Sequence, residues 1–257
     1  MDQIEQTTEI EDVCTAEYWA KGFAQCLSGF TPIQNFEFNI LKAKILHATA
    51  QEVSTLWPKI HKRIIKCEGP KDISSLPDAL SKLFETGSAT YYVCTEQALV
   101  SAVSASEVYF KDRLAYAIQS DKRLLNRFLD KEIKVNRILD TGLDLSENIG
   151  MLIVEKMKFQ NLDNVQNEYK KLFGFEPFTS EELKKLKKIF AIRHAIVHKS
   201  GIADHLFISE TGLDYEVGSR LFFKRDEILQ MIVFIEKIVT RIDSVLNKKL
   251  ISGELTT

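Results

Sequence analysis

The fold is decided by the stretch Phe190-Ala-Ile-Arg-His-Ala-Ile-Val-His-Lys-Ser-Gly201, which holds one arginine and two histidines. The residues before it have the signature of a helix start. Thr179 followed three residues later by Glu182 predicts a capping box, and Phe178 with Leu183 is placed to form a hydrophobic staple. Gly201 lies where a left-handed residue ends a helix. The sequence therefore predicts a helix over residues 180–200.

Arg193 occupies a position in this helix where an apolar residue is expected. The apolar residues that follow the 3–4 spacing of a buried stripe are Leu183, Leu186, Phe190 and Val197. Arg193 and His194 fall on the same stripe, and His198 lies on its margin. An arginine keeps its charge in a protein, so burying it requires an anion nearby, either a carboxylate of this chain or a phosphate.

A second helix, expected over residues 95–119 with Thr95 as a possible cap, offers such a carboxylate. Glu107 lies on its apolar stripe, between Val103 and Phe110, and we expect it to pair with Arg193. The alternative is that Glu107 lies at a solvated edge. The helix is also rich in small residues, which let another helix approach closely; they are Ala98, Ser101, Ala102, Ser104, Ala105 and Ser106.

The rest of the chain predicts an all-α fold with one short β-hairpin near the C-terminus. Helices are expected over 38–66, kinked or interrupted near Trp57-Pro58, over 121–139 and 145–172, and from a cap at Asp226 to about 249. The aromatic segment 215–223, with Gly212 before it and Gly218 within it, predicts the hairpin. Residues 68–77 contain the glycine, proline and serine residues that are typical of a linker. We therefore expect two parts: an N-terminal, mostly helical extension of unknown role over 1–90, and a helical domain over 91–250.

Composition is ordinary for a globular protein, with 45% hydrophobic and 27% charged residues. The formal net charge of −2 gives no global attraction to nucleic acid, so RNA binding would have to be local. The four cysteines form no C-x-x-C pair, which favours reduced thiols and a cytoplasmic location. The most apolar run, 228–242, is broken by charged residues, and we expect no membrane partner.

Arg193-His-Ala-Ile-Val-His198 resembles the R-x4-6-H motif of the HEPN superfamily, in which the residue after the arginine is commonly polar, as His194 is. The resemblance extends to Lys199-Ser-Gly-Ile-Ala-Asp204 and to Glu107-Val-Tyr-Phe-Lys-Asp112, the latter being similar to the first helix of many HEPN domains. Segments 159–162 and 169–175 resemble sequences before the motif helix of larger prokaryotic HEPN proteins. The similarity covers about 91–250.

The resemblance implies an up-and-down helical bundle that dimerises through its motif helices and a metal-independent endoribonuclease, often a toxin or anti-phage defence effector. An antitoxin or other defence-system protein is an implied partner. Members paired with nucleotidyltransferase antitoxins often carry a tyrosine two residues after the motif histidine, where this chain has Ser200. Other members lack activity and bind RNA or assemble a protein partner, and this is the alternative function.

The chemistry of the motif residues fits RNA cleavage by 2′-hydroxyl attack without a cofactor. Arg193 can bind phosphate oxygens and neutralise charge as it builds up. His198, in the last helical turn, suits a general acid because the helix dipole favours the imidazolium. Glu107 would orient Arg193. In a straight helix Arg193 and His198 point about 140° apart, so a two-fold pair of chains would complete the site more easily than one chain.

Two further patterns have plainer interpretations. His194 and His198 are four residues apart, as metal ligands can be, with Asp204 and His205 nearby, but there is no H-E-x-x-H motif and we predict no metal. The basic run made of Lys184, Lys185, Lys187 and Lys188 either contacts RNA phosphates or, more simply, forms a solvated face.

Overall fold

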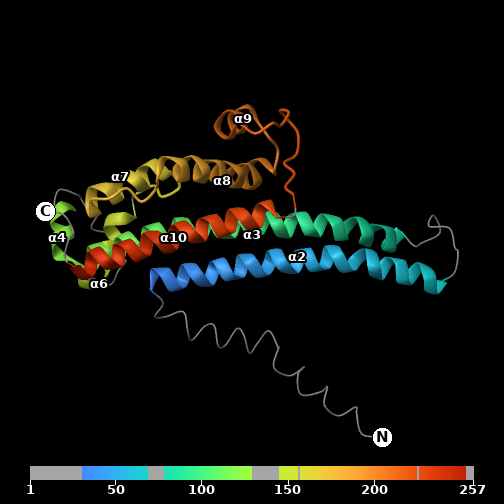
Figure 1. Ribbon diagram of the computed structural model, residues 1–257, viewed down its shortest axis with the longest axis horizontal. Coiled ribbons are helices and arrows are strands. Elements are labelled where there is room, and N and C mark those ends of the chain that lie inside the picture. The colour runs from blue at the N-terminus through green and yellow to red at the C-terminus, as the bar shows by residue number, and fades with distance from the viewer. Residues whose placement is uncertain (1–30, 69–77, 129–144, 156, 225, 253–257) are drawn as a thin grey trace, which may run out of the picture.

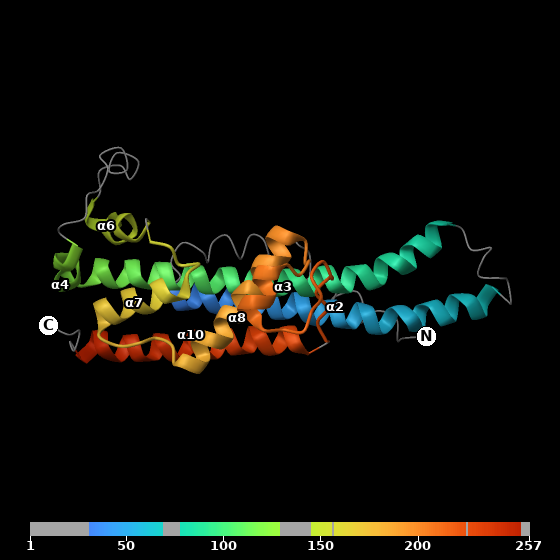
Figure 2. The same ribbon diagram turned by 90° about the horizontal axis from the view of Figure 1, so that it is seen from above.

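The computed structural model describes residues 31–68, 78–128, 145–155, 157–224 and 226–252. Two long helices, α2 (Pro32–Glu68) and α3 (Asp78–Ser120), lie side by side and antiparallel (Figure 1). Helix α10 (Glu227–Ser252) packs along both of them. The part of the α2–α3 pair nearest residues 69–77 extends beyond α10, as Figure 2 shows from above.

Shorter helices cover α3 on its remaining sides. Helix α6 (Leu145–Val154) and helix α8 (Ser180–Lys199) pack on α3, while α7 (Leu162–Phe173) and α9 (His205–Thr211) contact α8. A short turn of helix, α4 (Lys122–Leu125), continues as a 3₁₀ turn, η4 (Asn126–Phe128). The all-α expectation is confirmed for the described residues, which contain no strand.

One buried hydrophobic cluster joins the N-terminal helix to the rest of the bundle. Phe36 and Ile40 of α2 belong to it together with Tyr109 and Phe110 of α3. The rings of Phe36 and Tyr109 lie 5.6 Å apart, and Phe110 meets Phe178 edge-to-face at 5.6 Å. Edge-to-face pairs of this kind add to the stabilisation that burial alone provides.

Several expected boundaries differ from those of the structure. Helix α3 begins at Asp78 and not at Thr95, which is a buried residue inside it. It is therefore continuous across residues 90 and 91, where the sequence suggested a division between two parts of the chain. Helix α2 passes through Pro58 without ending, so of the two expected effects, a kink or an interruption, the interruption does not occur. A proline removes one hydrogen bond, and the helix continues on either side of that loss.

The expected helix over 145–172 is two helices, because residue 155 and residues 157–161, which lie between α6 and α7, are not helical. Of the expected helix over 121–139, the structure describes residues 121–128, which contain α4 and η4. Residues 129–144 lie outside the described residues, as does the linker at 69–77. Helix α10 carries the expected buried stripe, and its six predicted positions are all buried: Ile228, Ile232, Ile235, Val239, Ile242 and Leu246.

The expected hairpin over 215–223 is replaced by a loop. A single antiparallel bridge joins Ile202 and Arg220. The Tyr215 hydroxyl donates to the carbonyl of Phe222 and accepts from its backbone N–H, at 2.7 and 3.2 Å. Because that hydroxyl satisfies both backbone groups of Phe222, the segment needs no partner strand there.

A buried polar network fixes α10 against α3. Arg113 and Asp243 form an ion pair with Nε and Oδ1 3.1 Å apart, and their side chains are only 4% and 10% exposed. The Tyr109 hydroxyl donates to the same oxygen of Asp243 at 2.9 Å. Asn247 accepts from Arg113 and donates to the other oxygen of Asp243 at 2.7 Å. Each charge is thus paired and makes at least one hydrogen bond, which a buried charge requires, although the buried Nε of Arg113 itself makes none within the described residues.

Replacing Asp243 by alanine should cost about 3–5 kcal/mol of unfolding free energy, because it leaves the Arg113 charge buried without a counter-charge. Urea denaturation measures this. The matched control is Glu236→Ala on the same helix, which breaks a half-exposed pair with Lys44 and should cost about 1 kcal/mol or less. Equal losses in the two variants would show that the network does not hold α10.

Candidate functional site

Helix α8 has the start and end that the sequence predicts. The Thr179 hydroxyl accepts from the backbone of Glu182 at 3.2 Å, and the Glu182 carboxylate accepts from the backbone of Thr179 at 2.8 Å, which completes the capping box. At the other end both Ser200 (φ 54°) and Gly201 (φ 72°) are left-handed. The Gly201 N–H donates to the carbonyl of Ala195, which closes the helix.

The buried face of α8 is rotated from the expected stripe. The buried apolar residues are Leu186, Ile189, Ala191, Ile192, Ala195 and Ile196. Val197, expected to face inward, is 44% exposed, and His194 is exposed rather than part of the stripe. Ile189, Ile192 and Ile196 follow the same 3–4 spacing as the expected stripe. This face of the helix, and not the expected one, packs against the core.

Arg193 and Glu107 are brought together as the sequence predicts. Arg193 Nη2 lies 3.9 Å from Glu107 Oε2, which is an ion pair but too long for a hydrogen bond. The side chains are 17% and 15% exposed. Within the part of the chain described here, the buried Nε of Arg193 has no hydrogen-bond partner. Arg193 therefore has an unused Nε donor, which is shielded from solvent in this arrangement.

Burial dominates the electrostatics of Glu107. Loss of solvent raises the pKa of its carboxyl group, and the positive charge of Arg193 only partly opposes this effect. The attraction between the Glu107 carboxylate and Arg193 is thus weaker than it would be if the two groups were hydrogen-bonded. This arrangement leaves the guanidinium of Arg193 incompletely compensated.

The two histidines share the outer face of α8. Their ring centroids are 4.7 Å apart and their planes are inclined by 45°. Both residues are exposed, so their ring nitrogens are open to solvent. Next to them Asp204 caps α9 by accepting from the backbone of Phe207 at 2.8 Å. This hydrogen bond, aided by the charges of Lys199 and His194, lowers the pKa of Asp204.

The structure thus separates the predicted site residues into two pairs. Arg193 and Glu107 meet between α8 and α3, whereas His194 and His198 lie on a different, solvent-facing side of α8. Within the described ranges no group of three or more histidine, cysteine or acidic side chains is placed to hold a metal ion. No described helix is long and apolar enough to cross a membrane.

The small residues of α3 mostly serve packing inside the chain. Ala98, Ala102, Ala105 and Ser106 are buried, and only Ser101 of the set is exposed.

Two lysines of the basic run on α8 contact other side chains of the protein. Lys185 lies over the ring of Phe234, with 4.1 Å between Nζ and the centroid. Lys187 pairs with Asp163 at 2.7 Å.

An open cleft of about 580 Å³ adjoins His194 and was not foreseen from the sequence. It lies between the outer face of α8, the segment 158–163 that leads into α7, and Glu210 of α9. Its residues include Lys158 and Gln160. In the sequence, the feature that accompanies the cleft is the polar pair Gln160-Asn161 directly before a helix. Such a pair is typical of a helix cap and does not by itself indicate a cleft.

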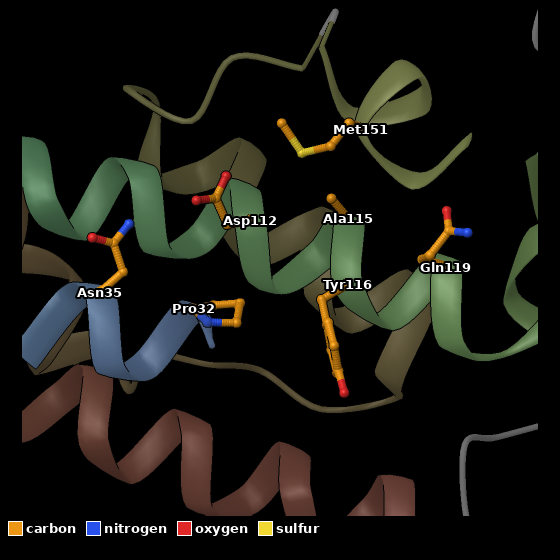
Figure 3. A pocket seen from close by; sticks show the side chains of 7 residues that line it. All are labelled: Pro32, Asn35, Asp112, Ala115, Tyr116, Gln119 and Met151. Carbon is orange, nitrogen blue, oxygen red and sulfur yellow. The ribbon is translucent and has the colours of Figure 1, made fainter. Parts of the chain in front are cut away.

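A second cavity, of about 270 Å³, lies where the start of α2 meets α3 and α6 (Figure 3). Asp112 and Asn35 face each other across it from α3 and α2, and Met151 of α6 lies above (Figure 3). Burial raises the pKa of Asp112. None of the seven lining residues is basic and none belongs to the predicted site, so this cavity does not suit a phosphate.

Comparison with known proteins assigns no relative to the chain: no family model matches it, and no curated protein or solved structure matches it significantly.

The pH dependence of stability tests the environment of Glu107. Because its folded-state pKa is raised, its contribution to stability is fully present below its unfolded pKa and is lost as the pH rises through the folded pKa. Glu107→Gln, which mimics the protonated form, should therefore equal the wild type at pH 4 and match or exceed its stability at pH 7. Urea denaturation at both pH values measures the difference.

The control is Glu210→Gln, which removes an exposed carboxylate and so reports the effect of net charge alone. A large loss of stability in Glu107→Gln at pH 7, absent in the control, would show that the ionised carboxylate is a strong partner of Arg193.

Proposed function

We propose that the protein is a metal-independent endoribonuclease whose reacting groups are Arg193, His194 and His198, with Glu107 as a positioning residue. The observation that carries the proposal is that an incompletely compensated guanidinium and two exposed imidazoles lie on the last two turns of one helix. A guanidinium stabilises charge on phosphorus, and imidazoles transfer protons near neutral pH.

Cleavage needs three events at one phosphodiester. The 2′-hydroxyl loses a proton as its oxygen attacks phosphorus, negative charge builds up on the non-bridging oxygens, and the 5′-oxygen gains a proton as its bond to phosphorus breaks. An imidazole, that of His194 or of His198 in a second copy of the chain, would accept the proton in the first event, Arg193 would serve the second, and His198 would donate the proton in the third. His194, whose ring lies 4.7 Å from that of His198, is placed to assist proton transfer or to bind phosphate. The products are a 2′,3′-cyclic phosphate and a 5′-hydroxyl.

Arg193 and His198 point to different sides of α8, which favours a site completed by a second copy of the chain. A two-fold axis near the end of α8 would bring Arg193 of one chain toward His198 of the other. The same separation also supports the second candidate, a non-catalytic module that binds RNA or assembles a partner such as an antitoxin. In that function the Arg193–Glu107 pair would be structural.

The proposed ribonuclease should cleave single-stranded RNA in the presence of EDTA. His198→Ala should lower the rate by about 10²- to 10⁴-fold, which is typical for loss of a general acid, without lowering the melting temperature, since His198 is exposed. His194→Ala should lower the rate less. The control is His205→Ala, an exposed histidine on α9, which should cleave like the wild type. Cleavage that is lost in EDTA and restored by zinc or manganese would contradict the mechanism.

Mixing two inactive variants tests the shared site. If one chain supplies Arg193 and its partner His198, then Arg193→Ala mixed with His198→Ala regains one intact site per mixed dimer, or about a quarter of wild-type activity after random exchange. The rate of RNA cleavage after co-refolding measures this. A mixture as inactive as its components, or a monomer in light scattering that cleaves normally, would rule out a shared site.

A further inference from the structure

The cleft beside His194 is large enough to hold a small ligand and is open to solvent. Its volume of about 580 Å³ falls within the range of about 300–1,000 Å³ that small-molecule sites occupy. Phe190, Ala191 and Leu162 give it an apolar wall. Gln160 and Asn161 place two amide side chains at its edge, and His194 connects it to the exposed outer face of α8.

We propose that this cleft holds the base of a nucleotide next to the phosphodiester at the histidine pair, so that the protein recognises single-stranded RNA in a base-dependent way. The proposal deepens and rests on the proposed function. A base in a single strand is unstacked and free to enter a cleft, where proteins stack it on aromatic rings and read its edge with hydrogen bonds. Phe190 supplies the ring, and the two amides supply the hydrogen bonds.

The side-chain amides of Gln160 and Asn161 differ in how many hydrogen bonds they can offer to a base. Gln160 is exposed, and its amide forms no hydrogen bond within the described residues. It can therefore offer both a donor and an acceptor to a base edge. The Asn161 oxygen already accepts from the backbone of Asp163 and Asn164 at 3.0 and 3.2 Å as the cap of α7. Its NH₂ group remains as a donor.

Charge determines which part of the nucleotide enters. Asp163 and Glu210 carry carboxylates at the cleft and would repel a phosphate placed inside it. Lys158 is exposed, and Lys187 forms a half-exposed pair with Asp163 that is weak enough to exchange partners. The two lysines can hold the phosphates on either side of the base. These charges therefore favour an uncharged base inside the cleft and the phosphates at its mouth.

The test uses the full chain carrying His198→Ala, so that RNA is not cleaved, and four fluorescein-labelled decamers made of only A, C, G or U. Fluorescence anisotropy should show that the protein prefers one base. Adding Gln160→Ala should abolish most of that preference. Adding Phe190→Leu, which keeps an apolar side chain but removes the aromatic face, should weaken binding of all decamers by about tenfold. Gln230→Ala, an exposed glutamine on α10 outside the cleft, is the control and should change nothing.

The outcomes separate this proposal from the proposed function. Binding whose base preference depends on Gln160, together with a wild type that does not cleave RNA, would support the cleft and overturn the ribonuclease. Cleavage by the wild type, with base preference and affinity unchanged by both cleft variants, would overturn the cleft and leave the ribonuclease standing. A protein that binds none of the decamers would overturn both.

Discussion

The buried ion pair between Arg113 and Asp243 determines where the helices of this protein lie. It ties α10 to the central helix α3 at a single register, because both charges lose solvent and each needs the other. Two residues before Asp243, Arg241 donates to the carbonyl of Pro177 at 2.9 Å and to the carboxylate of Glu182 at 2.7 Å. The first turn of α8 is thereby held by the same segment of α10 that is fixed to α3.

The position of α8 explains the separation of its polar groups. With its isoleucines turned toward the core, Arg193 faces α3 and meets Glu107, while His194 and His198 face solvent beside the cleft. An enzyme built on this helix therefore has its phosphate-binding charge and its proton-transfer groups on different sides. For the proposed ribonuclease, a second chain, or RNA that passes around the end of α8, would have to bring the two sides to one phosphodiester.

Sequence reasoning found the features that depend on neighbouring residues in the chain and missed those that depend on packing. The capping box of α8 and the buried stripe of α10 follow from local spacing, and both are confirmed. The pairing of Arg193 with Glu107 was predictable because each charge interrupts an apolar stripe. The same reasoning applied to Arg113, which precedes the buried Leu114, and to Asp243, which follows the buried Ile242, would have indicated the central network. The cleft could not be predicted, since segments distant in sequence form it.

Chemical footprinting of the histidines tests the central claim, that the outer face of α8 is where RNA reacts. Diethyl pyrocarbonate modifies exposed imidazoles, and mass spectrometry reports the modified fraction at each histidine. With the chain carrying Arg193→Ala and saturating single-stranded RNA, we predict that His194 and His198 become protected while the exposed His205 on α9 is modified as in the free protein. Equal modification of all three histidines with and without bound RNA would contradict the account.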